Sequence, residues 1–178
     1  MSKVAVAYTD FLPETIATLA DPGCLLATQG KNGSLNAMTI GWGTVGIVWG
    51  RPVFVVLVRP SRHTWKLLEE NGDFTVNVPP PELRKAVGFC GSKSRRDHDK
   101  FVETGMTPIP SQRVAAPIIE ECVVTYECRT IHKHQVVPGA LDPAVTKDCY
   151  RSGDFHTLYY GQILTVLADE DARERLKR

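Results

Sequence analysis

The segment Arg59-Pro60-Ser61-Arg62-His63-Thr64 combines two arginines and two hydroxyls at the expected start of a helix. A helix N-terminus offers unpaired backbone N–H groups and the positive end of the helix dipole. The guanidinium groups of Arg59 and Arg62 and the hydroxyls of Ser61 and Thr64 would add donors for a phosphate dianion. The same residues also suit an ordinary helix start, in which Ser61 is the N-cap and both arginines are solvated. The pattern thus indicates either a phosphate site or a plain cap.

A second segment of small, hydroxyl and basic residues, Phe89-Cys90-Gly91-Ser92-Lys93-Ser94-Arg95-Arg96-Asp97, leads into another expected helix and repeats this logic. Cys90 invites a nucleophile interpretation, which requires a nearby base or a positive field. Lys93 or the helix start would supply the field, but the sequence places no histidine partner beside the thiol. We therefore favour a packed or ligand-adjacent Cys90.

The segment Asn36-Ala37-Met38-Thr39 has the alternation of a strand, with Asn36 and Met38 on one face and Ala37 and Thr39 on the other. The Asn36 amide and exposed backbone groups at a strand edge would recognise a flat heterocycle, with Met38 packed on its face. Without a partner motif, an ordinary strand fits these four residues equally well.

Three histidines are candidate metal ligands. His132 and His134 share one face of an expected strand, and Cys149 or His156 would be needed to complete a zinc site. Because no spacing fixes a third or fourth ligand, surface histidines are the favoured interpretation. His156, at the entrance of a strand, suits either a pocket mouth or a turn.

Composition excludes several classes of protein. The 178 residues suffice for one domain with a core, and 43% apolar and 23% charged residues are ordinary values for a globular protein. A net charge of +1 predicts neither nucleic-acid nor membrane binding. The chain lacks a membrane-length apolar run and a convincing signal peptide. Five cysteines without a Cys-x-x-Cys pair indicate reduced thiols and a cytoplasmic protein. Dinucleotide, P-loop, nucleophile-elbow and kinase motifs are missing as well.

Apolar patterning and turn residues predict a mainly β chain with short helices. Strands are expected at 24–28, 35–40, 44–49, 53–58, 74–78, 122–135 and 157–168, and helices at 14–19, 62–71, 82–89 and 95–104. The strand at 122–135 should be half-exposed. We expect 136–155 to be irregular and 169–178 to form a frayed helix. Several strands with interposed helices favour an antiparallel barrel over a doubly wound sheet.

Turn and cap residues refine this outline. Asn32-Gly33 predicts a hairpin, and Arg51-Pro52 a break before the buried strand at 53–58. Gly72 should end the helix at 62–71. Ser94 and Asp97 resemble a capping box for the helix at 95–104, which Gly105 should end.

The ordered series of motifs resembles the flavin reductase-like family with the FMN-binding split barrel, in which flavoredoxin-like proteins occur. The motifs are NAMTIGW, RPSRHTWKLLEENGDFTVNVP, FCGSKSRRDHDKF, VVTYEC and GDFHTLYYG, spread over residues 20–168. The resemblance implies a single domain over residues 1–178, folded as a six-stranded Greek-key split β-barrel decorated by short helices. It also implies a homodimer with non-covalent FMN near the subunit interface.

The resemblance assigns the candidate residues to parts of the flavin. The segment Asn36–Thr39 and Trp42 would line the ring system and ribityl chain. The phosphate would be held by the first basic segment and the later loop, through Arg59, Ser61, Arg62, Thr64, Cys90, Gly91, Ser92 and Lys93. His156 would lie near the flavin and nicotinamide side. Here the family's Gly-Asp-His reads Gly-Asp-Phe-His, and the excursion at 136–153 is long, so the electron donor is not fixed.

The resemblance implies an FMN-dependent oxidoreductase, a flavin reductase or flavoredoxin, reduced by NAD(P)H or by a redox protein. Such chemistry belongs to the cofactor, which agrees with the lack of an acid–base pair or triad in the sequence. Two alternatives stay open. One is an electron-transfer module with little NAD(P)H turnover of its own. The other is a haem- or metal-binding split-barrel relative that uses His132, His134 or His156.

Overall fold

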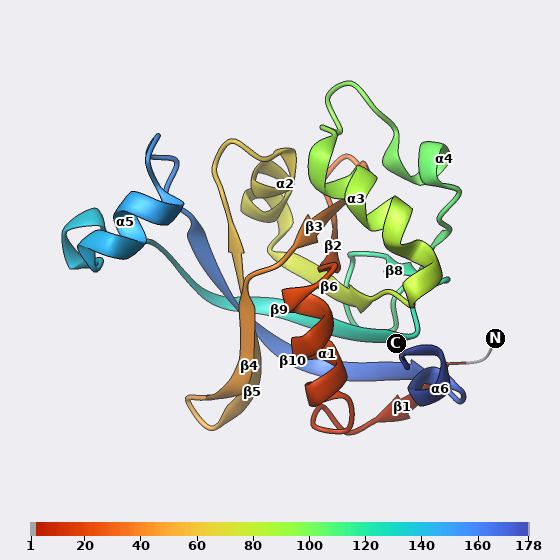
Figure 1. Cartoon of the computed structure of the whole chain (residues 1–178). Coiled ribbons are helices and arrows are strands. Elements are labelled where there is room, and N and C mark those ends of the chain that lie inside the picture. Colours follow the sequence, from red (N-terminus) through yellow and green to blue (C-terminus); the bar gives the residue numbers. More distant parts are fainter. Residues whose placement is uncertain (1–2, 178) are drawn as a thin grey trace.

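Long antiparallel strands dominate the computed structural model, which describes residues 3–177 (Figure 1). The main sheet has eight strands in the order β3-β2-β6-β9-β10-β5-β4, with β1 paired to the end of β10. Their bounds are β1 Lys3–Val6, β2 Cys24–Gln29, β3 Leu35–Ile40, β4 Gly43–Val48, β5 Arg51–Val58, β6 Asp73–Val78, β9 Val124–Gln135 and β10 Thr157–Asp169. A short ladder pairs β7 Pro108–Ile109 with β8 Ile118–Ile119. The predicted mainly β class with short helices is confirmed.

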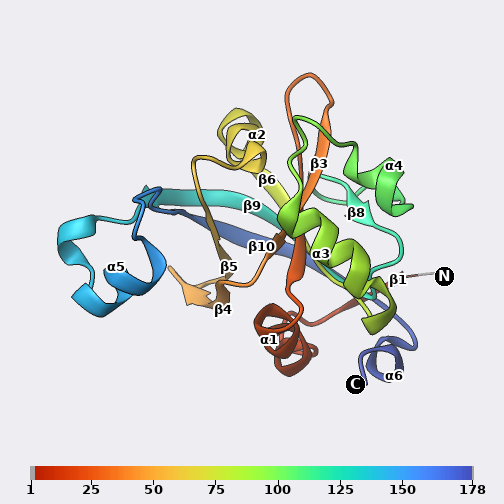
Figure 2. The same ribbon diagram turned by 45° about the horizontal axis from the view of Figure 1, so that its top comes forward.

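Six short α-helices decorate the described sheet. They are α1 Leu12–Ala20, α2 His63–Asn71, α3 Arg84–Ser92, α4 Lys100–Thr104, α5 Pro143–Cys149 and α6 Ala172–Arg175, with 3₁₀ turns η1 Pro81–Leu83 and η2 Pro138–Ala140. Helices α2 and α3 pack on β2 and β3. Figures 1 and 2 show α5 at the opposite end of the molecule from the two chain ends. Within residues 3–177, every helix is too short or too polar to span a bilayer.

The hairpin predicted at Asn32-Gly33 forms between β2 and β3, and a second hairpin, which was not predicted, joins β4 and β5. In the β2–β3 hairpin the Asn32 side chain accepts a hydrogen bond from the Ser34 N–H at 3.0 Å, and Gly33 has a φ of 80°. The β4–β5 hairpin turns at Trp49 and Gly50, whose φ angles of 51° and 69° suit a tight primed turn. Pro52 therefore pairs within the edge hairpin instead of breaking the chain.

Two predicted helix starts are wrong. Helix α2 begins at His63 with Arg62 as its N-cap, and Ser61 does not cap it. The helix expected at 95–104 begins only at Lys100, because the Asp99 side chain accepts the Val102 N–H and caps the chain there. Both predicted C-terminal glycines, Gly72 and Gly105, have left-handed backbone angles and end their helices.

The first half of β9 is buried on both faces, so the prediction of a half-exposed strand is wrong for this half. Thr125 and Glu127 are fully buried. The loop before β8 covers them, and the N–H groups of Gln112 and Arg113 donate to the Glu127 carboxylate at 2.9 and 2.6 Å. The two backbone donors satisfy the hydrogen-bonding needs of the carboxylate, so Glu127 can be buried without contact with water. The other half of β9 is mostly exposed on both faces, so it is not the half-exposed strand that the alternation predicted either.

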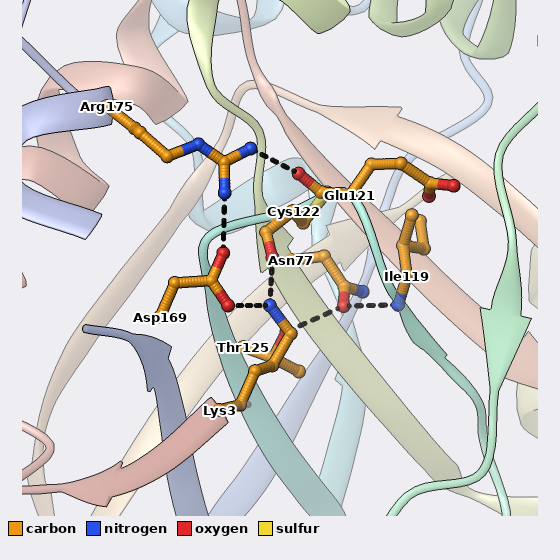
Figure 3. Close-up of polar contacts among 8 residues, drawn as sticks. All are labelled: Lys3, Asn77, Ile119, Glu121, Cys122, Thr125, Asp169 and Arg175. Carbon is orange, nitrogen blue, oxygen red and sulfur yellow. Dashed lines mark hydrogen bonds and ion pairs between the residues drawn. The ribbon is translucent and has the colours of Figure 1, made fainter. Parts of the chain in front are cut away.

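A buried ion-pair cluster joins β1, β10 and α6 (Figure 3). Lys3 Nζ donates to the Asp169 carboxylate at 2.9 Å and to the Cys122 carbonyl, and Arg175 donates to the same carboxylate at 2.7 Å. Asp169 is only 3% exposed, and both cations are paired with its buried charge. The frayed helix expected at 169–178 is reduced to the four residues of α6.

The core has two parts that together hold the site. One part fills the space between the sheet and α1, and its largest fully buried side chains are Tyr126, Tyr159, Phe54 and Phe74. Gly161 lies against the Phe74 ring so closely that a Cβ there would be 2.2 Å from it. The second part lies under α3 and α4 and includes Leu25, Ala27, Ala37, Val87, Cys90 and Phe101. It fixes the loop between α3 and α4 beside β3.

Candidate functional site

Two adjoining pockets lie beside β3 and the start of α2. The tryptophan pocket has a volume of about 180 Å³ and is lined by Met38, Thr39, Ile40, Gly41, Trp42, Leu57, Arg59, Arg62 and His156. The basic pocket has a volume of about 210 Å³ and is lined by Asn36, Met38, Ser61, Arg62, His63, Thr64, Cys90, Gly91, Lys93, Ser94, Arg95, Arg96 and Lys100. Met38 and Arg62 belong to both linings, so the pockets are neighbours.

All predicted site residues except Ala37 and Ser92 line one of these two pockets. Ala37 is fully buried in β3, where its carbonyl accepts a hydrogen bond from Lys100. The Ser92 hydroxyl is turned back on its own helix and donates to the carbonyls of Gly88 and Phe89. The structure thus brings together the two basic segments and the 36–42 segment, which are far apart in the sequence.

The start of α2 faces the basic pocket without a side-chain cap among the described residues. Thr64 is buried there, and its hydroxyl accepts a hydrogen bond from the Asn36 side-chain amide at 2.7 Å. The Asn36 Oδ1 atom is buried and has no hydrogen-bond partner within residues 3–177. The free N–H groups and the dipole of the first helical turn are therefore available to an anion in the pocket.

Arg59 and Ser61 hold a neighbouring loop, which differs from the phosphate role expected for them. Arg59 donates to the carbonyls of Cys149 and Asp154 at 2.8 and 2.9 Å, and its guanidinium lies 5.1 Å from the Tyr150 ring centre. The Ser61 hydroxyl donates to the Asp154 carboxylate at 2.6 Å. The geometry thus places Arg59 in the tryptophan pocket and uses most of its donors inside the chain.

The basic pocket carries cations without matching acids. The Arg62 and Lys93 side chains make no hydrogen bond or ion pair with any residue in 3–177, whereas Arg95 pairs with Asp99 at 3.2 Å. Lys100 is only 3% exposed, and its ammonium donates to the carbonyls of Ala37 and Cys90. Burial lowers the pKa of Lys100. Its ammonium forms no ion pair with a carboxylate of residues 3–177, so an anionic ligand would provide the counter-ion.

The pKa of His63 is affected by the same positive field. Its pKa is lowered from the usual value, first by burial and then by the neighbouring charges of Lys66, Arg95 and Arg96. Cationic neighbours disfavour a further positive charge, so the imidazole is held neutral. The pocket is therefore built for a ligand of negative charge.

Cys90 is a packed residue in this site. Its side chain is 1% exposed, and burial raises the pKa of the thiol to about 11 despite the nearby Lys100 ammonium. A thiol with that pKa is protonated at neutral pH and is a poor nucleophile. The favoured interpretation from sequence, a packed Cys90 beside a ligand site, agrees with this geometry.

His156 forms the wall of the tryptophan pocket opposite the β3 strand end. It is 8% exposed, and its ring centre lies 5.0 Å from that of Trp42. Its Nδ1 atom lies 2.8 Å from the Tyr150 hydroxyl. Burial, followed by the charge of Arg59, lowers the pKa of His156 to about 4. His156 is therefore a neutral hydrogen-bonding group at pH 7.

His132 and His134 lie outside both pockets. They are exposed on β9 and form a ring cluster with Trp49 and Tyr160. Within residues 3–177, no three or more His, Cys, Asp or Glu side chains are grouped as metal ligands.

The sequence-based site assignment left out Ile40, Gly41, Leu57, His63, Ser94, Arg95, Arg96 and Lys100. Ser94, Arg95 and Arg96 belong to the basic segment that the sequence singled out, although they were not assigned to the cofactor site. Lys100 gave no such signal, since its importance comes from burial under α3 rather than from its neighbours in sequence.

Comparison with known proteins identifies the family of the chain. The flavin reductase-like domain family matches residues 16–176. An uncharacterized protein of Archaeoglobus fulgidus is 32% identical over 131 residues, which cover 74% of this chain and 64% of that protein. This chain thus spans less than two thirds of the length of that relative.

Two solved structures share the fold. Flavoredoxin of Desulfovibrio vulgaris has a TM-score of 0.68 and 26% identity, covering 96% of this chain and 78% of that one. An FMN-binding domain of a flavin reductase-like enzyme from Shewanella baltica has a TM-score of 0.67 and 19% identity, covering 94% and 78%. The fold is the split-barrel fold of these flavin reductase-like neighbours. The chain belongs to the flavin reductase-like domain family.

Proposed function

We propose that the chain binds FMN non-covalently across the two pockets and passes hydride or electrons through it. The observation that carries this proposal is the set of uncompensated cations at the start of α2, directly beside a pocket lined by Met38, Trp42 and His156. Each pocket alone is smaller than the roughly 300 Å³ at which small-molecule sites usually begin. An elongated ligand with an anionic end and a flat apolar end suits both.

In this proposal the phosphate lies in the basic pocket. Arg62 and Lys93 are free to donate, the first turn of α2 supplies N–H groups, and Lys100 supplies a buried charge. Arg59 instead holds the loop at 149–154 and borders the ring side. This differs from the sequence-based assignment, in which Arg59 and Arg62 held the phosphate together.

The ring system lies in the tryptophan pocket. Met38 and Trp42 offer apolar and aromatic surface, and the strand end at Thr39–Gly41 offers backbone groups to a heterocycle. Bound flavin supplies the redox chemistry, whereas this chain's residues bind and orient it. His156, neutral at pH 7, contributes a hydrogen-bonding group at the wall of the pocket.

The test is a comparison of FMN with riboflavin, which lacks the phosphate. Titration into the full chain, followed by flavin fluorescence, should give at least roughly tenfold tighter binding of FMN, since one charge-assisted hydrogen bond contributes about 1.5–3 kcal/mol. Arg62→Ala with Lys93→Ala should remove most of that preference. Lys85→Ala is the matched control, because this exposed cation of α3 does not line either pocket. Equal affinities for FMN and riboflavin would contradict a phosphate in the basic pocket.

The kinetics of flavin reduction distinguish a reductase from an electron carrier. Stopped-flow mixing of the FMN-loaded chain with NADH and NADPH should bleach the flavin absorption if the chain is a reductase. Bleaching only by a reduced redox protein would identify an electron-transfer module with little NAD(P)H turnover.

We also propose that the protein is a cytoplasmic homodimer and that residues 1–178 of each subunit form a single domain. A physical reason for dimerisation is the apolar surface at the β4–β5 hairpin: Ile47 and Trp49 of the hairpin are 60% and 64% exposed, and Trp42, which directly precedes β4, is 44% exposed. Exposed large side chains gathered on one element are typical of a subunit contact. Light scattering of the purified chain should give twice the monomer mass, and a Trp49→Lys variant should shift it towards the monomer.

A further inference from the structure

Tyr150 makes a contact with the pocket wall that the site described above does not use. It follows α5 in the 136–155 segment, where the sequence predicted irregular structure, and it is only 5% exposed. Its hydroxyl lies 2.8 Å from His156 Nδ1, and the two rings meet edge to face with centres 5.5 Å apart. His156 thus contacts both Trp42 and Tyr150.

The Tyr150 ring is held on two further sides. It stacks on Phe155 with ring centres 4.7 Å apart, and the Arg59 guanidinium lies 5.1 Å from its centre. Arg59 also donates to the carbonyls of the residues on either side of the loop, Cys149 and Asp154. A hydroxyl held this way keeps its position whether or not a ligand is present, because every contact lies within the chain.

The chemistry of the pair decides which atom carries the hydrogen. Burial raises the pKa of the Tyr150 phenol, so the hydroxyl is protonated at neutral pH, and His156 is neutral. A neutral imidazole has one N–H donor and one acceptor nitrogen. A phenol is a more acidic donor than an imidazole N–H, and the positive Arg59 above the ring strengthens that donor. The hydroxyl therefore donates to Nδ1.

We propose that Tyr150 is a positioning residue that holds His156 as the tautomer with its hydrogen on Nε2. Nδ1 is occupied by the hydroxyl, so Nε2 is the only ring nitrogen left for a ligand in the tryptophan pocket. The pocket then presents a hydrogen-bond donor, which suits a carbonyl oxygen or an acceptor nitrogen of a heterocycle. That this heterocycle is a flavin rests on the proposed function, whereas the tautomer rests on the chain alone.

The groups around His156 agree with this assignment. Arg59 and Arg62 disfavour a second proton on the ring, and only Asp154 among the charges that act on it favours one. The Asp154 carboxylate is itself engaged by the Ser61 hydroxyl and N–H. The single hydrogen of the imidazole is therefore kept through the pH range around neutrality, and Tyr150 decides which nitrogen carries it.

The experiment is nitrogen NMR of the full-length chain, labelled with ¹⁵N and free of flavin. Long-range proton–nitrogen correlation separates the two tautomers, and His156→Gln assigns the signal among the five histidines. We expect His156 to show the Nε2–H pattern from pH 6 to 8. An Nδ1–H pattern in the wild-type chain would overturn the proposal without any variant.

Tyr150→Phe removes only the hydroxyl. We expect a mixture of both tautomers and a His156 pKa that moves up from about 4, because the lost hydrogen bond favoured the neutral ring. Tyr160→Phe is the matched control: Tyr160 contacts His132 and His134, so their signals should shift and that of His156 should not. An unchanged His156 signal in Tyr150→Phe would contradict the positioning role.

A second readout separates this proposal from the proposed function. In the FMN-loaded chain, Tyr150→Phe should shift the flavin absorption bands and the redox potential of the flavin. The dissociation constant of FMN should change little by comparison. If the wild-type chain binds no FMN while His156 shows the Nε2–H pattern, the proposed function fails and the Tyr150 assignment stands. If the wild-type chain binds FMN but His156 shows a mixture of tautomers, the Tyr150 assignment fails and the proposed function stands.

Discussion

Acid should destabilise the flavin-free chain through His156, and the effect follows from its buried position. The pKa of His156 is 6.5 in an exposed chain and about 4 in the folded protein, because burial and Arg59 disfavour the charged ring. Below pH 6.5 the unfolded chain binds a proton that the folded chain does not. Stability therefore falls as the pH is lowered from 6.5 to about 4 and is not reduced further by this group below that.

The size of the effect follows from the same two pKa values. At pH 5 the difference in proton binding corresponds to about 2 kcal/mol of lost stability, and at pH 4 and below to about 3 kcal/mol at most. Because many domains are stabilised by only about 5–15 kcal/mol, a loss of this size is readily measured.

Urea unfolding at pH 7, 6 and 5, analysed by linear extrapolation, measures this loss. The wild-type chain is compared with His156→Gln, in which the titrating group is absent and the other histidines still titrate. The stability difference between the two chains should shrink by about 2 kcal/mol from pH 7 to pH 5. A difference that is the same at all three pH values would refute a buried, neutral His156.

Other predictions concern packing, the loop and the salt response. Gly161→Ala should cost about 2 kcal/mol or more by urea unfolding, because its Cβ would lie 2.2 Å from a buried phenylalanine ring, whereas Gly46→Ala, with no atom within 4 Å, should change little. Arg59→Ala should speed proteolysis within 149–154, because the loop loses its guanidinium donors, and Arg62→Ala should not; equal cleavage would show that Arg59 does not hold the loop. Raising the salt concentration should weaken binding of FMN more than of riboflavin, and parallel titrations at low and high salt check this.

Local signals predicted much of the fold. Strand β3 spans the expected residues, and the buried run at 53–58 lies within β5, because uninterrupted β-branched residues suit burial on both faces. Gly72 and Gly105 end their helices as predicted, since a left-handed residue at a helix end is a short-range requirement.

The sequence could not predict features that depend on distant contacts. The polar face of β9 reads as exposed, and only the loop at 111–119 makes Glu127 a buried acceptor of backbone hydrogen bonds. Helix α4 starts late because Asp99 caps it, although the Ser94 and Asp97 spacing favoured an earlier start.

The same limit applies to the site. Sequence spacing identified the basic segments but not the role of each cation. That role depends on which residues contact the cation in the folded chain. Arg59 reaches carbonyls about ninety residues away, as its contacts with Cys149 and Asp154 show, and Lys100 is buried by packing of α3 and α4. Arg62 and Lys93 are left free, because no acceptor or acid of residues 3–177 lies within hydrogen-bond or ion-pair distance of their charged groups.

The visible absorption spectrum of the full chain, recorded as purified and again after FMN addition and desalting, tests flavin binding most directly. We expect the two flavin bands to remain with the protein after desalting, at close to one FMN per chain. A colourless protein after both steps would contradict FMN binding in the two pockets.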